Sequence, residues 1–214
     1  MTENTLSAGE VQRFYNRIGK RYDWFAIFEG RAKARGIDLL SLTPGLRLLH
    51  VGLGTGKEHA QIAQRLAPSG IAYGLDLSAV MVSLAGARVE TPLCQADARY
   101  LPYAGDSFDR LYAAYVLDLL SGEDIQLVLG EFRRALKPGG RLVLISLTEG
   151  ATAPSRSLVG AWKLAFSISP IACGGCRPIQ LASLVESAGL RLACREVVIQ
   201  LALPSEVIAA DKTA

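Results

Sequence analysis

A glycine-rich turn between an apolar run and a helix-forming stretch constrains this sequence most. The apolar run covers residues 46–51, the turn GLGTG covers 52–56, and the helix-forming stretch covers 57–67. A strand, a tight turn and a helix in this order begin a βαβ unit of a parallel sheet. Glycines let the backbone approach a ligand closely, and the first N–H groups of the helix can bind an anion. The sequence therefore predicts an α/β protein with a ligand site at this turn.

Further apolar runs alternate with helix-forming stretches after the turn. Strands are expected at four of them, 71–75, 93–96, 109–115 and 141–147. Helices are expected after two N-cap residues, Ser78 and Ser121, and Ser121 has Asp124 three positions on, as in a capping box. This alternation is typical of a doubly wound, mostly parallel sheet. A length of 214 residues suits a single domain of this kind.

The end of the chain breaks the alternation. Residues 150–157 are expected to form a loop, and the apolar stretch 158–173 follows it; a helix is expected to start at Pro178 and to end at Gly189. Two strands, 190–202 and 207–210, then come too close together for a helical crossover. We therefore expect these two strands to pair antiparallel.

The spacing of the glycines separates three kinds of nucleotide site. A P-loop would need glycine at position 51 and Ser or Thr after Lys57, and this chain has Val51 and Glu58. A dinucleotide fingerprint would need a third glycine at 57. The remaining pattern, GxGxG, has Asp76 at the end of the next strand, 20 residues after the last glycine. A carboxylate there can accept hydrogen bonds from the two hydroxyls of a ribose.

Composition and charge limit the kinds of partner that are expected for this protein. The net charge is only +3 and the basic residues are scattered, so no nucleic-acid partner is expected. The first ten residues lack the features of a signal peptide, so we expect a cytoplasmic protein. The stretch 158–173 is too short and too interrupted to span a membrane, although it could lie on one. Cys173 and Cys176 have CxxC spacing without a second pair, so no metal centre is expected and the motif is interpreted as a glycine-rich turn.

Four segments together resemble the class I S-adenosylmethionine-dependent methyltransferases: LLHVGLGTG, YGLDLS, QADARYLPYAGDSFD and RRALKPGGRLVLI. The segment FYNRIGKRYDWF resembles the opening of the branch that holds quinone C-methyltransferases and bacterial phosphatidylethanolamine N-methyltransferases. The segment PIQLASLVESAGL and the residues after it resemble the end of that branch. The resemblance implies a Rossmann-like sheet of seven strands with an antiparallel C-terminal pair, and S-adenosyl-L-methionine as cofactor.

The same resemblance divides the single domain, 1–214, into four parts. Residues 1–42 are expected to form an N-terminal helical cap and 43–149 the cofactor-binding core. Residues 150–176 are expected to form an apolar insertion that covers the acceptor site as a lid, or that contacts a membrane surface. Residues 177–214 are expected to supply the last helix and the antiparallel strands.

Carried over position by position, the resemblance implies a set of cofactor-binding residues. The glycines would pass under the methionine part, Asp76 would hold the ribose, Leu77 and Met81 would flank the adenine, and Tyr22 would close over the cofactor. The full set is Tyr22, His50, Gly52, Leu53, Gly54, Gly56, Asp76, Leu77, Met81, Asp97, Ala98 and Ala114.

Two positions depart from the family pattern. His50 stands where an acidic residue usually helps to receive the methionine ammonium, and a neutral imidazole could still accept a hydrogen bond there. Asp118-Leu119 stands where quinone C-methyltransferases carry an Arg-Asn pair. The catalytic base is left open, with four candidates: Tyr22, His59, Tyr115 and Asp118.

The sequence therefore predicts methyl transfer to a small apolar or amphiphilic acceptor, and a phospholipid amine is the favoured hypothesis. A quinone-type or other small-molecule C- or O-methyltransferase is the alternative. A third hypothesis, motivated by His50, is a protein that binds S-adenosylmethionine without turnover. The oligomeric state is left open.

Overall fold

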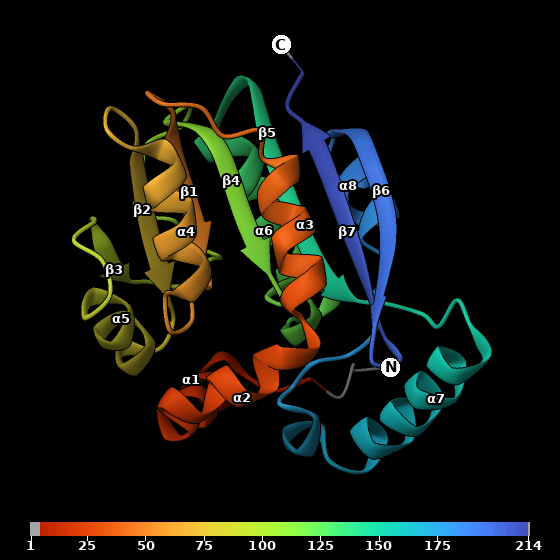
Figure 1. The fold of residues 1–214 in the computed structure, drawn as a ribbon. Helices are drawn as coiled ribbons and strands as arrows, with labels where there is room; N and C mark the ends of the chain where they lie inside the picture. The colour runs from red at the N-terminus through yellow and green to blue at the C-terminus, as the bar shows by residue number, and fades with distance from the viewer. Residues whose placement is uncertain (1–4, 214) are drawn as a thin grey trace.

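The computed structural model describes residues 5–213. Within them, seven strands form one sheet in the order β3-β2-β1-β4-β5-β7-β6 (Figure 1). The neighbours from β3 to β5 pair in parallel, whereas β7 is antiparallel to both β5 and β6. The strands are β1 (Arg47–Val51), β2 (Ile71–Asp76), β3 (Leu93–Gln95), β4 (Phe108–Ala114), β5 (Leu136–Leu147), β6 (Arg191–Gln200) and β7 (Leu203–Asp211). The predicted fold class, with its antiparallel C-terminal pair, is confirmed.

Helices cover both faces of the sheet. On one face, α3 (Gly30–Leu39) and α4 (Lys57–Leu66) pack against alternate residues of the central strands, such as Leu48 and Tyr112. On the other face, α6 (Gly122–Ala135) and α8 (Leu181–Ser187) pack against the intervening residues, such as Leu49 and Leu111. The period of two in a strand produces this division of the core into two clusters.

The helix starts follow the polar residues that the sequence offers. Ser78 accepts a hydrogen bond from the N–H of Met81 and begins α5 (Ala79–Gly86), and Ser121 caps α6 through the N–H of Asp124. Both predicted N-caps are confirmed. At the other end of the chain, Ser7 and Glu10 form a reciprocal capping box at the start of α1 (Ala8–Ile18).

The region after β5 differs from the predicted boundaries. Helix α7 (Ala153–Ile168) begins inside the predicted loop, because Thr152 and Ser155 form a capping box and Pro154 suits a first turn. The short helix η4 (Pro170–Cys173) follows it, and α8 begins at Leu181 rather than at Pro178.

The hairpin turn also lies elsewhere than predicted. The chain reverses at Leu201 and Ala202, both with positive φ, and Pro204-Ser205 already belongs to β7. The predicted strands, 190–202 and 207–210, leave residues 203–206 between them, whereas the turn lies just before these residues.

Short helices cover the carboxyl ends of the parallel strands (Figure 1). They are α1, η1 (Gly19–Arg21), α2 (Tyr22–Phe25) and η2 (Ala26–Phe28). Helix α3, the last part of the predicted cap, lies instead along the sheet against β5, β6 and β7. The cover over the strand ends is thus formed by the residues before α3.

Candidate functional site

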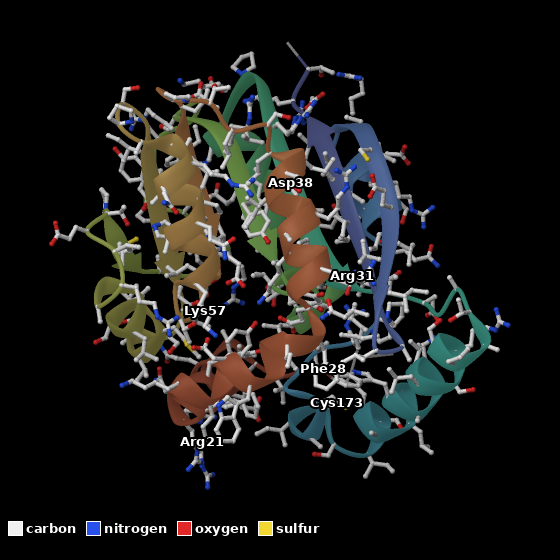
Figure 2. The ribbon with its side chains drawn as sticks, viewed as in Figure 1. Arg21, Phe28, Arg31, Asp38, Lys57 and Cys173 are labelled. Atoms are coloured by element: carbon white, nitrogen blue, oxygen red, sulfur yellow. The ribbon has the colours of Figure 1, made fainter. Side chains whose placement is uncertain are left out.

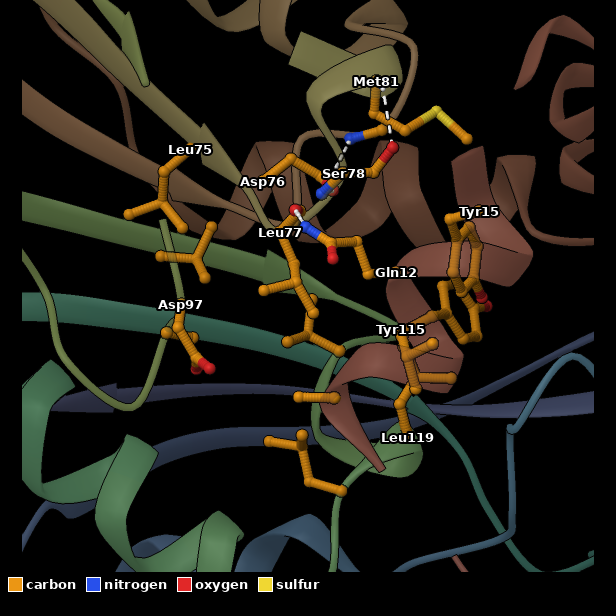
Figure 3. A pocket seen from close by; sticks show the side chains of 18 of the residues that line it. Gln12, Tyr15, Leu75, Asp76, Leu77, Ser78, Met81, Asp97, Tyr115 and Leu119 are labelled. Carbon is orange, nitrogen blue, oxygen red and sulfur yellow. Dashed lines mark hydrogen bonds between the residues drawn. The ribbon is translucent and has the colours of Figure 1, made fainter. Parts of the chain in front are cut away.

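A pocket lies at the carboxyl ends of β1, β2, β3 and β4, beneath α1 (Figure 3). The strand ends contribute residues such as Val51, Leu75, Asp76 and Ala114. In an open α/β sheet this edge is where ligands bind. The structure therefore places a pocket where the glycine-rich turn predicted a ligand site.

The glycine turn supplies backbone to the pocket. Gly52, Gly54 and Gly56 all have positive φ, and an added Cβ at Gly52 would lie 2.3 Å from Val116 Cγ2. At Gly54 an added Cβ would lie 3.4 Å from the Tyr22 ring. A side chain is therefore disfavoured at Gly52 by conformation and by space, and at Gly54 by conformation. The turn leaves room for a ligand to lie directly on its backbone.

Asp76 is held rigidly at the end of β2. One carboxylate oxygen accepts the N–H of Gly54 at 2.9 Å, and the other accepts the N–H of Ser78 at 2.9 Å. Burial raises the pKa of Asp76 and the backbone hydrogen bonds partly offset this rise. Each carboxylate oxygen can accept a second hydrogen bond, so the group can bind a diol in the pocket.

Asp97 lines the pocket and already has a partner. The Nε and Nη2 atoms of Arg99 donate to the two oxygens of Asp97, at 2.7 to 3.2 Å, and the third nitrogen, Nη1, donates to Asp124. Burial alone would raise the pKa of Asp97, but Arg99 outweighs this effect and lowers it. The charge of Asp97 is therefore already neutralised by Arg99, whereas Asp76 is held by backbone N–H groups.

A buried ionic cluster lies behind the pocket where α3 begins. Lys33 Nζ is 2.8 Å from Glu29 Oε2 and 3.6 Å from Glu58 Oε1. The same ammonium donates to Tyr22 Oη at 3.4 Å and lies over the rings of both Tyr22 and Tyr115. Tyr22 in turn donates to Glu29. This cluster fixes the two tyrosines that line this part of the pocket.

A second network, which the sequence analysis did not identify, holds α2 on the glycine turn. Asp23 accepts the hydroxyl of Thr55 at 2.6 Å and pairs with Arg88 at 2.9 Å and Lys57 at 3.3 Å. Because Asp23 directly follows Tyr22, these bonds keep the Tyr22 ring above Gly54. Nothing in the local pattern relates Arg88 to Asp23, since they lie 65 positions apart.

Most predicted cofactor residues lie on the pocket wall, and three do not. Those that line it are Tyr22, Gly52, Gly54, Asp76, Leu77, Met81, Asp97, Ala98 and Ala114. Leu53 points into the core, and Gly56 packs against Ala85 as the N-cap of α4. His50 is buried on the face of the sheet that α4 covers.

His50 faces away from the pocket because side chains alternate along β1. Its neighbours Leu49 and Val51 belong to the opposite face, and Val51 reaches the pocket. The His50 ring packs 5.5 Å from His59 and 4.9 Å from Tyr112. Burial, together with the charges of His59 and Lys33, keeps the pKa of His50 well below its usual value. The prediction that His50 contacts the cofactor does not fit this placement.

The base candidates separate into two groups. Tyr22 and Tyr115 line the pocket, but burial and the nearby Glu29 charge raise the pKa of both, so they remain protonated at neutral pH. His59 is buried beside Thr91 and outside the lining, and burial lowers its pKa to about 4. Asp118 is fully buried and also outside the lining, behind Leu119. No candidate is both in the lining and able to take a proton readily.

The protonation of Asp118 makes the free energy of unfolding depend on pH. Burial, partly offset by the N–H of Leu147, raises the pKa of Asp118 to about 7. Because this value exceeds that of the unfolded chain, about 3.9, the stabilisation is complete below that pH and is lost as pH rises through 7. We expect Asp118→Asn, which cannot ionise, to gain up to about 4 kcal/mol relative to the parent chain between pH 4 and pH 8. Urea unfolding at several pH values measures this, and parallel pH profiles of the two proteins would contradict it.

The predicted lid does not cover this pocket. No residue of 150–176 is among those that line it. Gly174 and Gly175 form a turn after η4 that packs against Phe14 and Leu6. Burial raises the pKa of both Cys173 and Cys176, as expected for thiols in a structural turn.

Helix α1, which belongs to the predicted N-terminal helical cap, covers the pocket. The residues that line the pocket from this side are Leu6, Ala8, Val11, Gln12 and Tyr15. Gln12 also donates to the carbonyl of Leu77, which fixes the helix to the end of β2. Gln12 and Leu77 lie 65 positions apart, so no local pattern in the sequence indicates this contact.

Comparison with known proteins identifies the family. Residues 49–144 match the family model that is described as a methyltransferase domain. The malonyl-[acyl-carrier protein] O-methyltransferase of Herminiimonas arsenicoxydans is 34% identical over 68% of this chain, which spans only 54% of that protein. The ubiquinone/menaquinone biosynthesis C-methyltransferase of Geotalea daltonii is 30% identical over 69% of this chain and 67% of its own length. The chain belongs to the S-adenosylmethionine-dependent methyltransferase family.

A solved methyltransferase shares the fold. Geranyl diphosphate C-methyltransferase from Streptomyces coelicolor, solved with Mg²⁺, geranyl diphosphate and S-adenosyl-L-homocysteine, superposes with a TM-score of 0.67 at 15% identity. The match covers 86% of this chain and 79% of that one.

Among residues 5–213, no helix has the length and apolarity that crossing a membrane requires.

Proposed function

We propose that this methyltransferase transfers a methyl group from S-adenosylmethionine to a small, largely apolar acceptor of the quinone type. The supporting observation is the division of the pocket wall. Its ionised side chains come from the end of β2, from the loop after β3 and from α6: Asp76, Asp97, Arg99 and Asp124. The N-terminal segment 6–22 and residues 114–120 contribute only apolar, tyrosine and glutamine side chains. An acceptor bound beside Tyr22 and Tyr115 therefore meets a mostly apolar surface.

The residues on the charged side fit the cofactor. Asp76 has free acceptor capacity for the two ribose hydroxyls, and Gly52 and Gly54 present backbone to the pocket. Leu77 and Met81 supply apolar surface for the adenine. S-adenosylmethionine, when bound, supplies a methyl group that is already activated as a sulfonium. Tyr22 would then exclude water and fix the acceptor. Alignment of the acceptor with the methyl group is the main requirement for displacing the sulfonium sulfur.

None of the four base candidates both lines the pocket and takes a proton readily, because Tyr22 and Tyr115 stay protonated and His59 and Asp118 lie outside the lining. Burial in an apolar pocket raises the pKa of a phenol and lowers that of an ammonium, so this observation does not separate a quinone-type ring from an amine. The quinone-type ring is supported by the apolar wall and by the names of the relatives, which do not support the phospholipid amine that the sequence favoured. The position of His50 also removes the motive for a protein without turnover.

Transfer of a labelled methyl group to three acceptors tests the proposal. An alkyl-substituted hydroquinone, phosphatidylethanolamine vesicles and a malonyl thioester are each incubated with the enzyme and labelled S-adenosylmethionine. We expect label in the hydroquinone, with Asp76→Ala as the inactive blank. Label only in phosphatidylethanolamine or only in the malonyl ester would refute the quinone-type acceptor. Absence of label in all three, with cofactor binding intact, would refute the proposed acceptor class.

A further inference from the structure

Large apolar side chains are exposed at one end of the molecule. Twelve such side chains are exposed among the described residues, and seven of them form what we call the apolar rim: Trp24, Ile27, Phe28, Leu164, Ile168, Ile171 and Leu201. Trp24 is 80% exposed and Ile168 is 78% exposed. Single exposed apolar residues are ordinary, but a concentration of them marks an interaction surface.

Contacts in the structure bring the segments of the rim together. Gln200 donates to the carbonyl of Ile27 at 2.7 Å, which fixes the hairpin turn with Leu201 beside η2. Tyr15 of α1 reaches the carbonyl of Gly174, directly after η4. Helices α7 and η4 pack on each other. The rim therefore borders the carboxyl ends of the strands, where the pocket lies (Figure 1).

The charges beside the rim are mostly positive. The exposed side chains of Arg13, Arg17, Lys20 and Arg21 form no ion pair with another residue in the described part of the chain. Arg21 extends away from the sheet (Figure 2). Residues 150–185, which include α7 and η4, contain three basic residues and no acidic residue, and one of the three, Lys163, pairs with Glu149 just before this range. The acidic side chains nearby, Asp23 and Glu29, are paired internally.

We propose that the apolar rim docks on the surface of an anionic lipid bilayer. Exposed tryptophan and aliphatic side chains insert at the boundary between headgroups and acyl chains, and flanking Arg and Lys side chains are attracted to anionic headgroups. The outer face of α7 suits this arrangement, because Leu164 and Ile168 are one helical turn apart and both are exposed. A protein partner would not require this excess of positive charge. Docking would place the pocket beside the acyl chains.

One consequence rests on the proposed function. If the acceptor is an apolar ring, docking lets it pass from the bilayer into the pocket without crossing water. The docking itself depends only on the rim and its charges. Binding to vesicles without cofactor or acceptor therefore tests the rim separately from the reaction.

Flotation with vesicles measures the docking. The full chain is mixed with vesicles of phosphatidylcholine alone or of phosphatidylcholine with about 30% phosphatidylglycerol, an anionic lipid that gives the vesicle a negative surface potential. We expect at least tenfold tighter binding to the anionic vesicles, and a further tenfold loss with Trp24→Ser/Ile168→Ser. Lys20→Glu/Arg21→Glu is expected to remove most of the preference for anionic lipid, by roughly fivefold per charge. The preference for anionic vesicles, and its loss in Lys20→Glu/Arg21→Glu, should both become smaller as the salt concentration rises.

The matched control is Tyr100→Ser/Leu127→Ser, which removes two exposed apolar side chains away from the rim. It should bind vesicles as the parent chain does, and all variants should keep the melting temperature and the affinity for S-adenosylhomocysteine. Equal binding of rim and control variants would overturn the proposal, as would absence of binding to either vesicle. If the rim substitutions instead dissociate a dimer in sedimentation velocity, the rim is a subunit interface and the proposal is wrong.

Discussion

Asp76→Ala is expected to weaken the binding of S-adenosylhomocysteine by 100-fold or more. The carboxylate is held by the N–H groups of Gly54 and Ser78, so its remaining lone pairs are fixed toward the pocket. Two hydrogen bonds from ribose hydroxyls to a charged acceptor contribute about 1.5–3 kcal/mol each, and the alanine variant loses both. A loss of about 3–6 kcal/mol corresponds to a factor of at least 100 in the dissociation constant. Titration calorimetry measures it directly.

Two variants control this experiment. Asp38→Ala removes an exposed carboxylate that pairs with Arg65 far from the pocket, and should bind the cofactor product normally. Asp97→Asn should weaken binding less than Asp76→Ala, because Arg99 already holds the Asp97 carboxylate. The melting temperature without ligand shows whether each variant is folded. Unchanged affinity in a folded Asp76→Ala protein would show that the cofactor binds elsewhere.

The sequence predicted the parts of the site that depend on local chemistry. Glycines in a GxGxG turn need positive φ, and a carboxylate at a strand end can be located by spacing alone, so Gly52, Gly54 and Asp76 lie where expected. The face of a strand on which a side chain lies is a tertiary property. His50 was assigned to the pocket by its place in a motif, although its neighbour Val51 is the residue that reaches the pocket.

Contacts between distant segments could not be predicted. The network of Asp23, Thr55 and Arg88 joins three elements, and no local pattern signals it. The hairpin turn was misplaced for a related reason. Leu201 and Ala202 adopt positive φ without the glycine or asparagine that usually marks such a turn, and the pairing of β6 with β7 imposes it. Local propensity is overridden where tertiary pairing decides.

Lys33→Met is expected to lower the free energy of unfolding by about 3–5 kcal/mol, the usual cost of removing one partner from a buried ion pair. Lys33 is 4% exposed and is the cation that neutralises Glu29 and Glu58 beneath the two tyrosines. Methionine fills a similar volume, so the loss reports the uncompensated carboxylates rather than a cavity. Urea unfolding at pH 7 measures it. The control Arg65→Met breaks an exposed pair with Asp38 and should cost less than about 1 kcal/mol.

A second substitution separates the charge of Lys33 from its effect on the tyrosines. In Lys33→Met/Glu29→Gln the nearest buried carboxylate is removed as well, so we expect part of the lost stability to return. Tyr22 would still lack the ammonium over its ring, and its hydroxyl would keep only a neutral partner in place of Glu29. The KM for S-adenosylmethionine should therefore be raised in Lys33→Met and should stay raised in the double variant, while stability recovers in the double variant. Recovery of both quantities together would show that Lys33 serves stability alone and does not position Tyr22 over the glycine turn.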